Sequence, residues 1–170
     1  YSLEWLESQL RKNRRWAETF SLRVGNINNK LELEIFHGVE EFHIRFIALG
    51  IEGSVRGINI EDYRPDLIIL DDVLDDENCS SIYQMEKIAD RIEGAIKDSL
   101  APTSEAPHAK LVFINTPIDR NDPIERLEKD GEWSFHRFGC FDENGRSRWE
   151  ARYPTEVLQG QKNAARERNK

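Results

Sequence analysis

The stretch RPDLIILDDVLDDE, residues 64–77, is the most informative part of this 170-residue sequence for the fold. It contains four consecutive aliphatic residues, Leu67 to Leu70, which are followed at once by Asp71 and Asp72. An aliphatic run without polar alternation is typical of a parallel strand that is covered on both faces. We therefore predict a buried parallel strand over residues 66–71, with two adjacent carboxylates at its carboxyl end.

A second stretch of the same kind follows downstream. Residues 110–114, KLVFI, are mostly apolar and lead directly into Asn115, Thr116 and Pro117. Between the two stretches, Ser81 and Gln84 match a capping box, and the apolar spacing from Ile82 predicts a helix that ends near residue 100. A strand–helix–strand order favours a parallel pair, and such sheets bind ligands beyond the carboxyl ends of their strands. We expect the two acids and residues 115–117 to meet at that edge.

The remaining elements follow from spacing and turn chemistry. The fold class they predict is α/β, with a mostly parallel sheet flanked by helices. The expected elements are a helix over 2–20 capped by Ser2, a turn over 25–30, hairpin strands over 31–36 and 42–49 around His37–Gly38, a helix over 122–129 with Pro123 in its first turn, a strand over 132–138, and a final helix from about Thr155.

Composition excludes several classes of protein. Charged residues make up 33% and hydrophobic residues 38% of the chain, as in a soluble globular domain, and no apolar run approaches a membrane span. Cys79 and Cys140 stand alone, which fits a reducing compartment, and the four histidines lack metal-binding spacing. The net charge is −8, and the basic clusters at 11–15 and 166–170 are interpreted as solvated helix faces.

An aliphatic strand that ends in two acids is the Walker B pattern. In such a site Asp71 serves a magnesium ion, usually through water, and Asp72 orients or deprotonates the water that attacks the γ-phosphate. Asn115 and Thr116 would lie near that phosphate, and Arg56, flanked by glycines, could reach it as an arginine finger. Structural roles remain open for each of them: loop and helix capping for the acids, a strand-exit turn for residues 115–117, and a surface position for Arg56.

The order of four stretches resembles the ATPase domain of the large terminase subunit of tailed bacteriophages, over nearly the whole chain. These stretches are GIEGSVRG (50–57), RPDLIILDDV (64–73), LVFINTPIDRNDP (111–123) and WEARYPTEVL (149–158). The resemblance implies a P-loop NTPase-like fold, of which this chain would form part of the ATPase core. It also implies a motor that couples ATP hydrolysis to translocation of genome DNA into a procapsid.

The resemblance also implies roles for particular residues. Asp71 matches the metal-associated Walker B Asp and, with Thr116, would contact the nucleotide. Asp72 matches the catalytic acid, and Arg56 matches the arginine that some members insert into the neighbouring subunit's active site. Asn115, Thr116 and Pro117 match the motif that couples hydrolysis to DNA movement.

Cofactors, partners and domain organisation are expected on the same basis. The cofactors would be ATP and Mg²⁺. The partners would be double-stranded DNA, the terminase small subunit, the portal protein and further copies of the chain in a homo-oligomeric ring, in the cytoplasm of the bacterial host and without a membrane. Residues 1–150 would form the C-terminal portion of the ATPase domain, and residues 151–170 a helical segment leading to the linker and nuclease domain.

Two departures from the family pattern affect these expectations. Many members carry Glu where Asp72 stands, and Glu77 is a weaker substitute for that acid. No G-x-x-x-x-G-K-[ST] phosphate loop occurs in the sequence. We therefore expect the phosphate loop and the adenine-side motif to precede Tyr1, the nuclease carboxylates to follow Lys170, and these 170 residues alone not to hydrolyse ATP.

Three other interpretations remain open. The first is another P-loop motor such as a helicase core, which a second RecA-like domain after Lys170 would indicate. The second is a metal-dependent nuclease built on Asp71, Asp72, Asp75 and Asp76. The third is a scaffold without catalysis, which absence of nucleotide binding by the complete protein would indicate.

Overall fold

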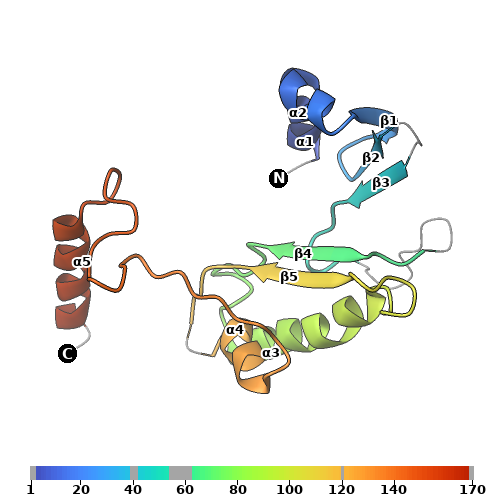
Figure 1. Ribbon diagram of the computed structural model, residues 1–170. Helices are drawn as coiled ribbons and strands as arrows, with labels where there is room; N and C mark the ends of the chain where they lie inside the picture. The colour runs from blue at the N-terminus through green and yellow to red at the C-terminus, as the bar shows by residue number, and fades with distance from the viewer. Residues whose placement is uncertain (1–2, 39–41, 54–62, 120, 169–170) are drawn as a thin grey trace. The chain divides into compact units, whose positions relative to one another are not determined.

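The computed structural model describes residues 3–38, 42–53, 63–119 and 121–168 (Figure 1). The chain divides into two compact units, residues 1–126 and 127–170. The described residues have a mixed α/β fold with a three-stranded antiparallel sheet and a two-stranded parallel sheet. The expectation of a mostly parallel sheet is therefore wrong for this part of the chain. The functional boundary expected at residue 150 stays a prediction.

Among the helices of the described ranges, none combines the length and the apolar character needed to cross a bilayer.

The antiparallel sheet consists of β1 (Leu22–Asn28), β2 (Glu32–His37) and β3 (Phe42–Ile47), in that order. The hairpin expected between the last two strands is confirmed, since His37 pairs with Phe42 and Glu32 with Ile47. Gly38 follows β2 with a φ of 73°, a left-handed conformation that glycine adopts without strain. The turn expected over 25–30 is wrong in its first part, because residues 25–28 belong to β1.

Two short helices, α1 (Glu4–Lys12) and α2 (Arg14–Thr19), precede this sheet. The single helix expected over 2–20 is wrong because the chain breaks at Asn13. The Asn13 side chain accepts a hydrogen bond of 3.2 Å from the Trp16 amide, so it caps α2. The expected cap, Ser2, lies outside the described residues. Leu10 of α1 forms a buried cluster with Leu33 and Ile35 of β2, which makes this cluster the core of the antiparallel part.

Glu34 on β2 is a carboxylate enclosed by a bulge of β1. The β1–β2 register shifts between Val24 and Asn28, and only 6% of Glu34 is exposed. Its Oε2 accepts a 2.8 Å hydrogen bond from the Asn26 amide, and its Oε1 lies 3.2 Å from His43 Nδ1. The Asn26 hydrogen bond is the largest cause of a lowered Glu34 pKa. A Cβ at position 25 would lie 2.3 Å from Glu34 Oε2, so this bulge requires Gly25.

The parallel pair consists of β4 (Leu67–Asp71) and β5 (Lys110–Ile114). The connection between them is α3 (Ile82–Arg91), which continues through η1 (Ile92–Ile96) and η2 (Lys97–Ser99) along one face of the pair (Figure 1). The expected cap of α3 is confirmed, since the Gln84 amide donates to Ser81 Oγ at 3.2 Å. The buried apolar residues of this part are Leu70, Leu74, Met85, Ile88, Ala89, Ile92, Ile96 and Ala101.

Only one face of the parallel pair is well covered. Leu70 is 7% exposed, whereas Leu67, Ile69 and Ile114 are 53%, 55% and 56% exposed. Successive side chains of a strand point to opposite faces, and paired residues of neighbouring strands share a face. The expectation that this strand is buried on both faces is therefore wrong, because one face carries half-exposed aliphatic side chains.

The last helices are α4 (Pro123–Asp130) and α5 (Thr155–Arg168), both close to the expected positions. Asp122 is fully buried just before α4, and its carboxylate accepts hydrogen bonds from the amides of Ile118 at 2.9 Å and Glu125 at 3.2 Å. It therefore caps α4 and fixes the loop that follows β5. The strand expected over 132–138 is wrong, since those residues lie in no helix or strand.

Candidate functional site

The parallel pairing of β4 and β5 brings the sequence-predicted residues together. Asp71 pairs with Ile114 in the register, and the Asp72 amide donates a 2.9 Å hydrogen bond to the Ile114 carbonyl oxygen. Asn115 and Thr116 follow Ile114 directly. The two acids and the Asn-Thr pair thus leave neighbouring strands at the same edge, as the sequence predicted. Their chemical roles stay predictions.

The two acids sit in different backbone conformations. Asp71 is the last residue of β4, whereas Asp72 has a φ of 50°, in the left-handed region. Asp and Asn enter this region more readily than other residues with a Cβ. The chain therefore turns immediately after Asp71, and both residues are exposed at the turn. Asparagine is the substitution that removes the charge of Asp72 without adding backbone strain.

Asn115 joins the loops that follow the two strands. Its Oδ1 accepts a 3.0 Å hydrogen bond from the Leu74 amide, and its Nδ2 donates to the Thr116 carbonyl oxygen at 3.0 Å. Leu74 is only 3% exposed, so its amide depends on this acceptor. The sequence placed Asn115 near a phosphate but missed this structural role, because the partner lies 41 positions away. The Asn115 side chain therefore helps to hold in place the turn that carries Asp72.

Asp75, another acid of the loop that follows β4, forms part of a hydrogen-bonded turn. Asp75 and Asn78 exchange hydrogen bonds, with Asp75 Oδ1 accepting from the Asn78 amide at 2.7 Å and Asn78 Oδ1 from the Asp75 amide at 2.9 Å.

Burial, followed by the nearby charges of Asp122 and Asp75, raises the pKa of the Cys79 thiol. Cys79 is therefore a protonated thiol at neutral pH rather than a reactive thiolate.

The geometry bears on how a metal could be held. Within the described ranges, no three His, Cys, Asp or Glu side chains converge as a metal-binding group. Asp71 is an exposed single carboxylate at a strand end. Mg²⁺ binds through one or two carboxylates together with substrate phosphates and retained water, so a single Asp is compatible with it. The structure does not support the two-metal cluster considered for Asp71, Asp72, Asp75 and Asp76, because these acids do not converge as a metal-binding group.

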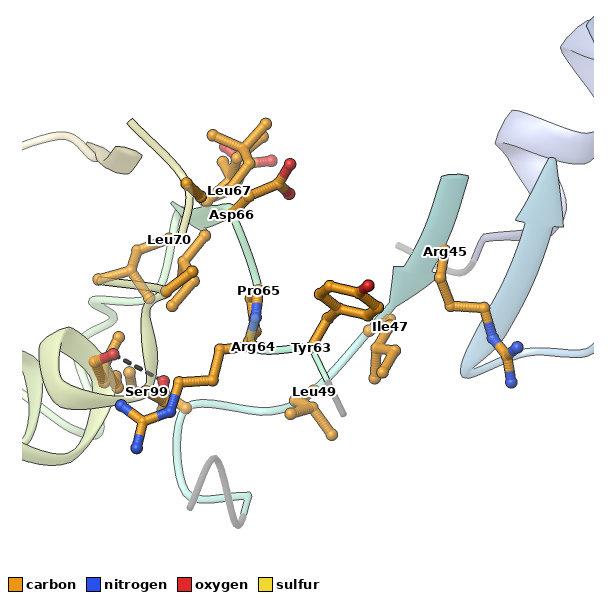
Figure 2. Close-up of a pocket in the computed structure, with 18 of the residues that line it drawn as sticks. Arg45, Ile47, Leu49, Tyr63, Arg64, Pro65, Asp66, Leu67, Leu70 and Ser99 are labelled. Atoms are coloured by element: carbon orange, nitrogen blue, oxygen red, sulfur yellow. Dashed lines mark hydrogen bonds between the residues drawn. The ribbon is translucent and has the colours of Figure 1, made fainter. Parts of the chain in front are cut away.

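A cavity of about 830 Å³ has Asp71 among its lining residues. Figure 2 shows other residues that line it. Most of the labelled lining is apolar, including Ile47, Leu49, Tyr63 and the half-exposed Leu67. Charged groups also line the cavity, among them the carboxylates of Asp66, Asp71 and Glu105 and the side chains of Arg45 and Arg64. Small-molecule sites commonly combine apolar walls with a few polar groups that fix the orientation of the ligand. The open face of β4 therefore contributes to a hollow beside the candidate site.

Two further residues were predicted to belong to the site. Arg56 is outside the described residues, so its expected finger role stays a prediction. Glu77, the weaker candidate acid, is exposed in the turn after β4, and its carbonyl oxygen accepts a 3.4 Å hydrogen bond from the Ser80 amide.

Comparison of the chain with protein-family models, with curated proteins and with solved structures finds no significant match. The class that the fold defines is therefore a mixed α/β protein, and any more particular assignment depends on the strand-end motifs.

Proposed function

We propose that this chain is part of a viral DNA-packaging ATPase of the terminase large-subunit type, which couples ATP hydrolysis to translocation of double-stranded DNA into a procapsid. The observation that supports this proposal best is the parallel register of β4 and β5, which places Asp71 and Asp72 beside Asn115 and Thr116. P-loop motors place their metal-associated acid and their nucleotide-sensing polar residues at neighbouring strand ends in this way.

In this proposal the described residues would have distinct tasks. Asp71 would hold Mg²⁺ together with the phosphates and water, and the bound ion would neutralise charge on the phosphates. Asp72, at the turn, would accept a proton from the attacking water or orient it. Thr116 is exposed at the exit of β5, where its hydroxyl could contact a phosphate oxygen. Asn115 would transmit displacement of the β5 exit to the turn carrying Asp72, through its hydrogen bond to Leu74.

The test is ATP turnover by the full-length gene product with Mg²⁺. We expect Asp72→Asn to lower the turnover number at least about 100-fold, as loss of a positioned acid–base group does. Asp71→Asn should lower it by a similar factor, because it removes the carboxylate that would hold the ion. The matched control is Asp76→Asn, an exposed acid on the same loop, which should leave turnover within about twofold.

Other outcomes would count against the proposal. Near-wild-type turnover in either strand-end variant would remove the acids from the mechanism. Turnover that single-stranded DNA stimulates, with strand separation and no packaging, would identify a helicase instead. DNA cleavage with Mg²⁺ or Mn²⁺ that Asp71→Asn abolishes while ATP has no effect would identify a nuclease.

A further inference from the structure

A group of aromatic rings with cations placed on them lies in residues 127–170. Arg152 lies 5.0 Å from the ring centroid of Trp149 and 5.6 Å from that of Tyr153, and the two rings meet edge to face at 6.0 Å. Lys162 lies 5.1 Å from the Phe141 ring. We call this group the cation–aromatic patch, and its members are Phe141, Arg148, Trp149, Arg152, Tyr153 and Lys162.

The patch is held in place by a local hydrogen-bond network. The amides of Arg152 and Tyr153 donate to the Trp149 carbonyl oxygen at 3.0 and 2.8 Å, which closes a tight turn. The Glu150 carboxylate accepts from the Thr155 amide at 3.1 Å and from its hydroxyl at 2.7 Å, tying this turn to the start of α5. Both hydrogen bonds lower the Glu150 pKa, and the bond from the Thr155 hydroxyl has the larger effect. The rings are therefore positioned before any partner binds.

The rings remain accessible although cations lie on them. Trp149 is 57% and Tyr153 45% exposed, so a large part of each residue is open. The network does not bury Arg148, whose Nε donates to the Phe141 carbonyl oxygen at 3.1 Å while the residue stays exposed. Both cations and open ring surface are thus available to a partner.

Charge indicates the kind of partner. Residues 141–170, which include the whole patch, contain seven Lys and Arg against five Asp and Glu, a net charge of +2 in a chain whose total is −8. A partner that carries regular negative charge and flat apolar surfaces matches this composition. Single-stranded nucleic acid has both, because its phosphates attract Arg and Lys while its unpaired bases stack on aromatic rings.

We propose that the cation–aromatic patch binds single-stranded DNA, with Trp149 and Tyr153 stacking on unpaired bases and Arg148, Arg152 and Lys162 contacting phosphates. A duplex fits less well, since its bases already stack on one another and expose only their edges. The inference goes beyond the ATPase proposal and does not depend on Asp71 or Asp72.

The test is fluorescence anisotropy of a labelled 20-nucleotide single strand titrated with the full chain at low salt. We expect Trp149→Ala to weaken binding about 5- to 150-fold, the range for loss of one stacked base, and Trp149→Phe to restore most of it. Arg148→Gln and Arg152→Gln should each lower the slope of log K against log salt by about 0.7, the value for one phosphate contact on a single strand.

Matched controls lie in the other unit. Trp5→Ala removes a tryptophan that is 66% exposed on α1, and Lys87→Gln removes an exposed positive charge on α3. Neither variant should change the affinity by more than about twofold. Circular dichroism spectra matching those of the unsubstituted chain would confirm that each variant is folded.

Four results would overturn the proposal. The first is absence of binding up to about 100 μM protein, which is the weak limit for non-specific association. The second is a loss of affinity in Trp5→Ala equal to that in Trp149→Ala, and the third is duplex binding that is as strong as single-strand binding and insensitive to Trp149. The fourth is concentration-dependent self-association that Trp149→Ala abolishes, without any DNA binding. The last result would identify the patch as a protein interface.

Discussion

Asn115→Ala should destabilise the part of the chain that contains β4 and β5. The substitution leaves the Leu74 amide without its acceptor at a residue only 3% exposed, and it removes the Nδ2 bond to the Thr116 carbonyl oxygen. An unpaired buried donor costs about 1–3 kcal/mol, and the second, more exposed bond contributes less. We therefore expect the free energy of unfolding to fall by about 2 kcal/mol. With a urea dependence of about 2 kcal/mol per molar, the unfolding midpoint should fall by about 1 M.

Urea unfolding followed by far-ultraviolet circular dichroism measures this change, and amide hydrogen exchange locates it. The Leu74 amide should exchange faster in Asn115→Ala. Asn115→Asp keeps an acceptor for Leu74 and should lose less stability, most clearly at high salt, where repulsion from Asp71 and Asp72 is screened. Asn163→Ala, at an exposed position of α5, is the matched control and should change the unfolding free energy by less than about 0.5 kcal/mol. Unchanged stability and unchanged Leu74 exchange in Asn115→Ala would refute the structural role.

Three further perturbations test other parts of the structure. Gly25→Ala should lower the free energy of unfolding by about 1–3 kcal/mol, because its Cβ would lie 2.3 Å from Glu34 Oε2. Gly94→Ala places its Cβ in open space and should not lower that free energy. If Gly25→Ala destabilises a Glu34→Ala background as much as it destabilises the unsubstituted chain, the steric cause is contradicted. Asp122→Ala should cost about 1–2 kcal/mol through loss of the α4 cap, measured by thermal unfolding, and Asp122→Asn should retain part of that stability. The lowered Glu34 pKa stabilises the fold above its ordinary value of 4.5, so stability should fall as pH drops from there through the folded pKa. A pH series should show a shallower fall in Glu34→Gln, and an unchanged slope would exclude this carboxylate.

The sequence predicted the parallel pair well because its signals are local. Each strand is a short aliphatic run with an abrupt polar exit, and Ser81 marks the start of the connecting helix. Burial on both faces was predicted wrongly because the same aliphatic pattern occurs when one face stays open, as at Leu67 and Ile69. Hydrophobicity alone does not distinguish these two cases.

The elements that were missed depend on distant contacts. Residues 25–28 of β1 were interpreted as part of a turn, because Gly25 and the asparagines after it favour turns. In the structure Gly25 instead makes room for a carboxylate nine positions away. The break at Asn13 has a local signal, since Asn is a frequent N-cap, but the apolar spacing on both sides concealed it. At the candidate site, the sequence identified the acids and Asn115 but not the Leu74 amide. Every residue except proline has a backbone N–H, so the residue type does not show which amide needs an acceptor.

The half-covered β4–β5 pair has a practical consequence for work with the purified chain. Within the described ranges each of these strands has one hydrogen-bonded neighbour, and Leu67, Ile69 and Ile114 on their open face are more than half exposed. Unpaired strand edges next to apolar surface invite intermolecular strand addition and aggregation. We therefore expect colloidal stability, rather than melting temperature, to limit usable stock concentrations. Dynamic light scattering across a dilution series would reveal that limit before any enzymatic assay is attempted.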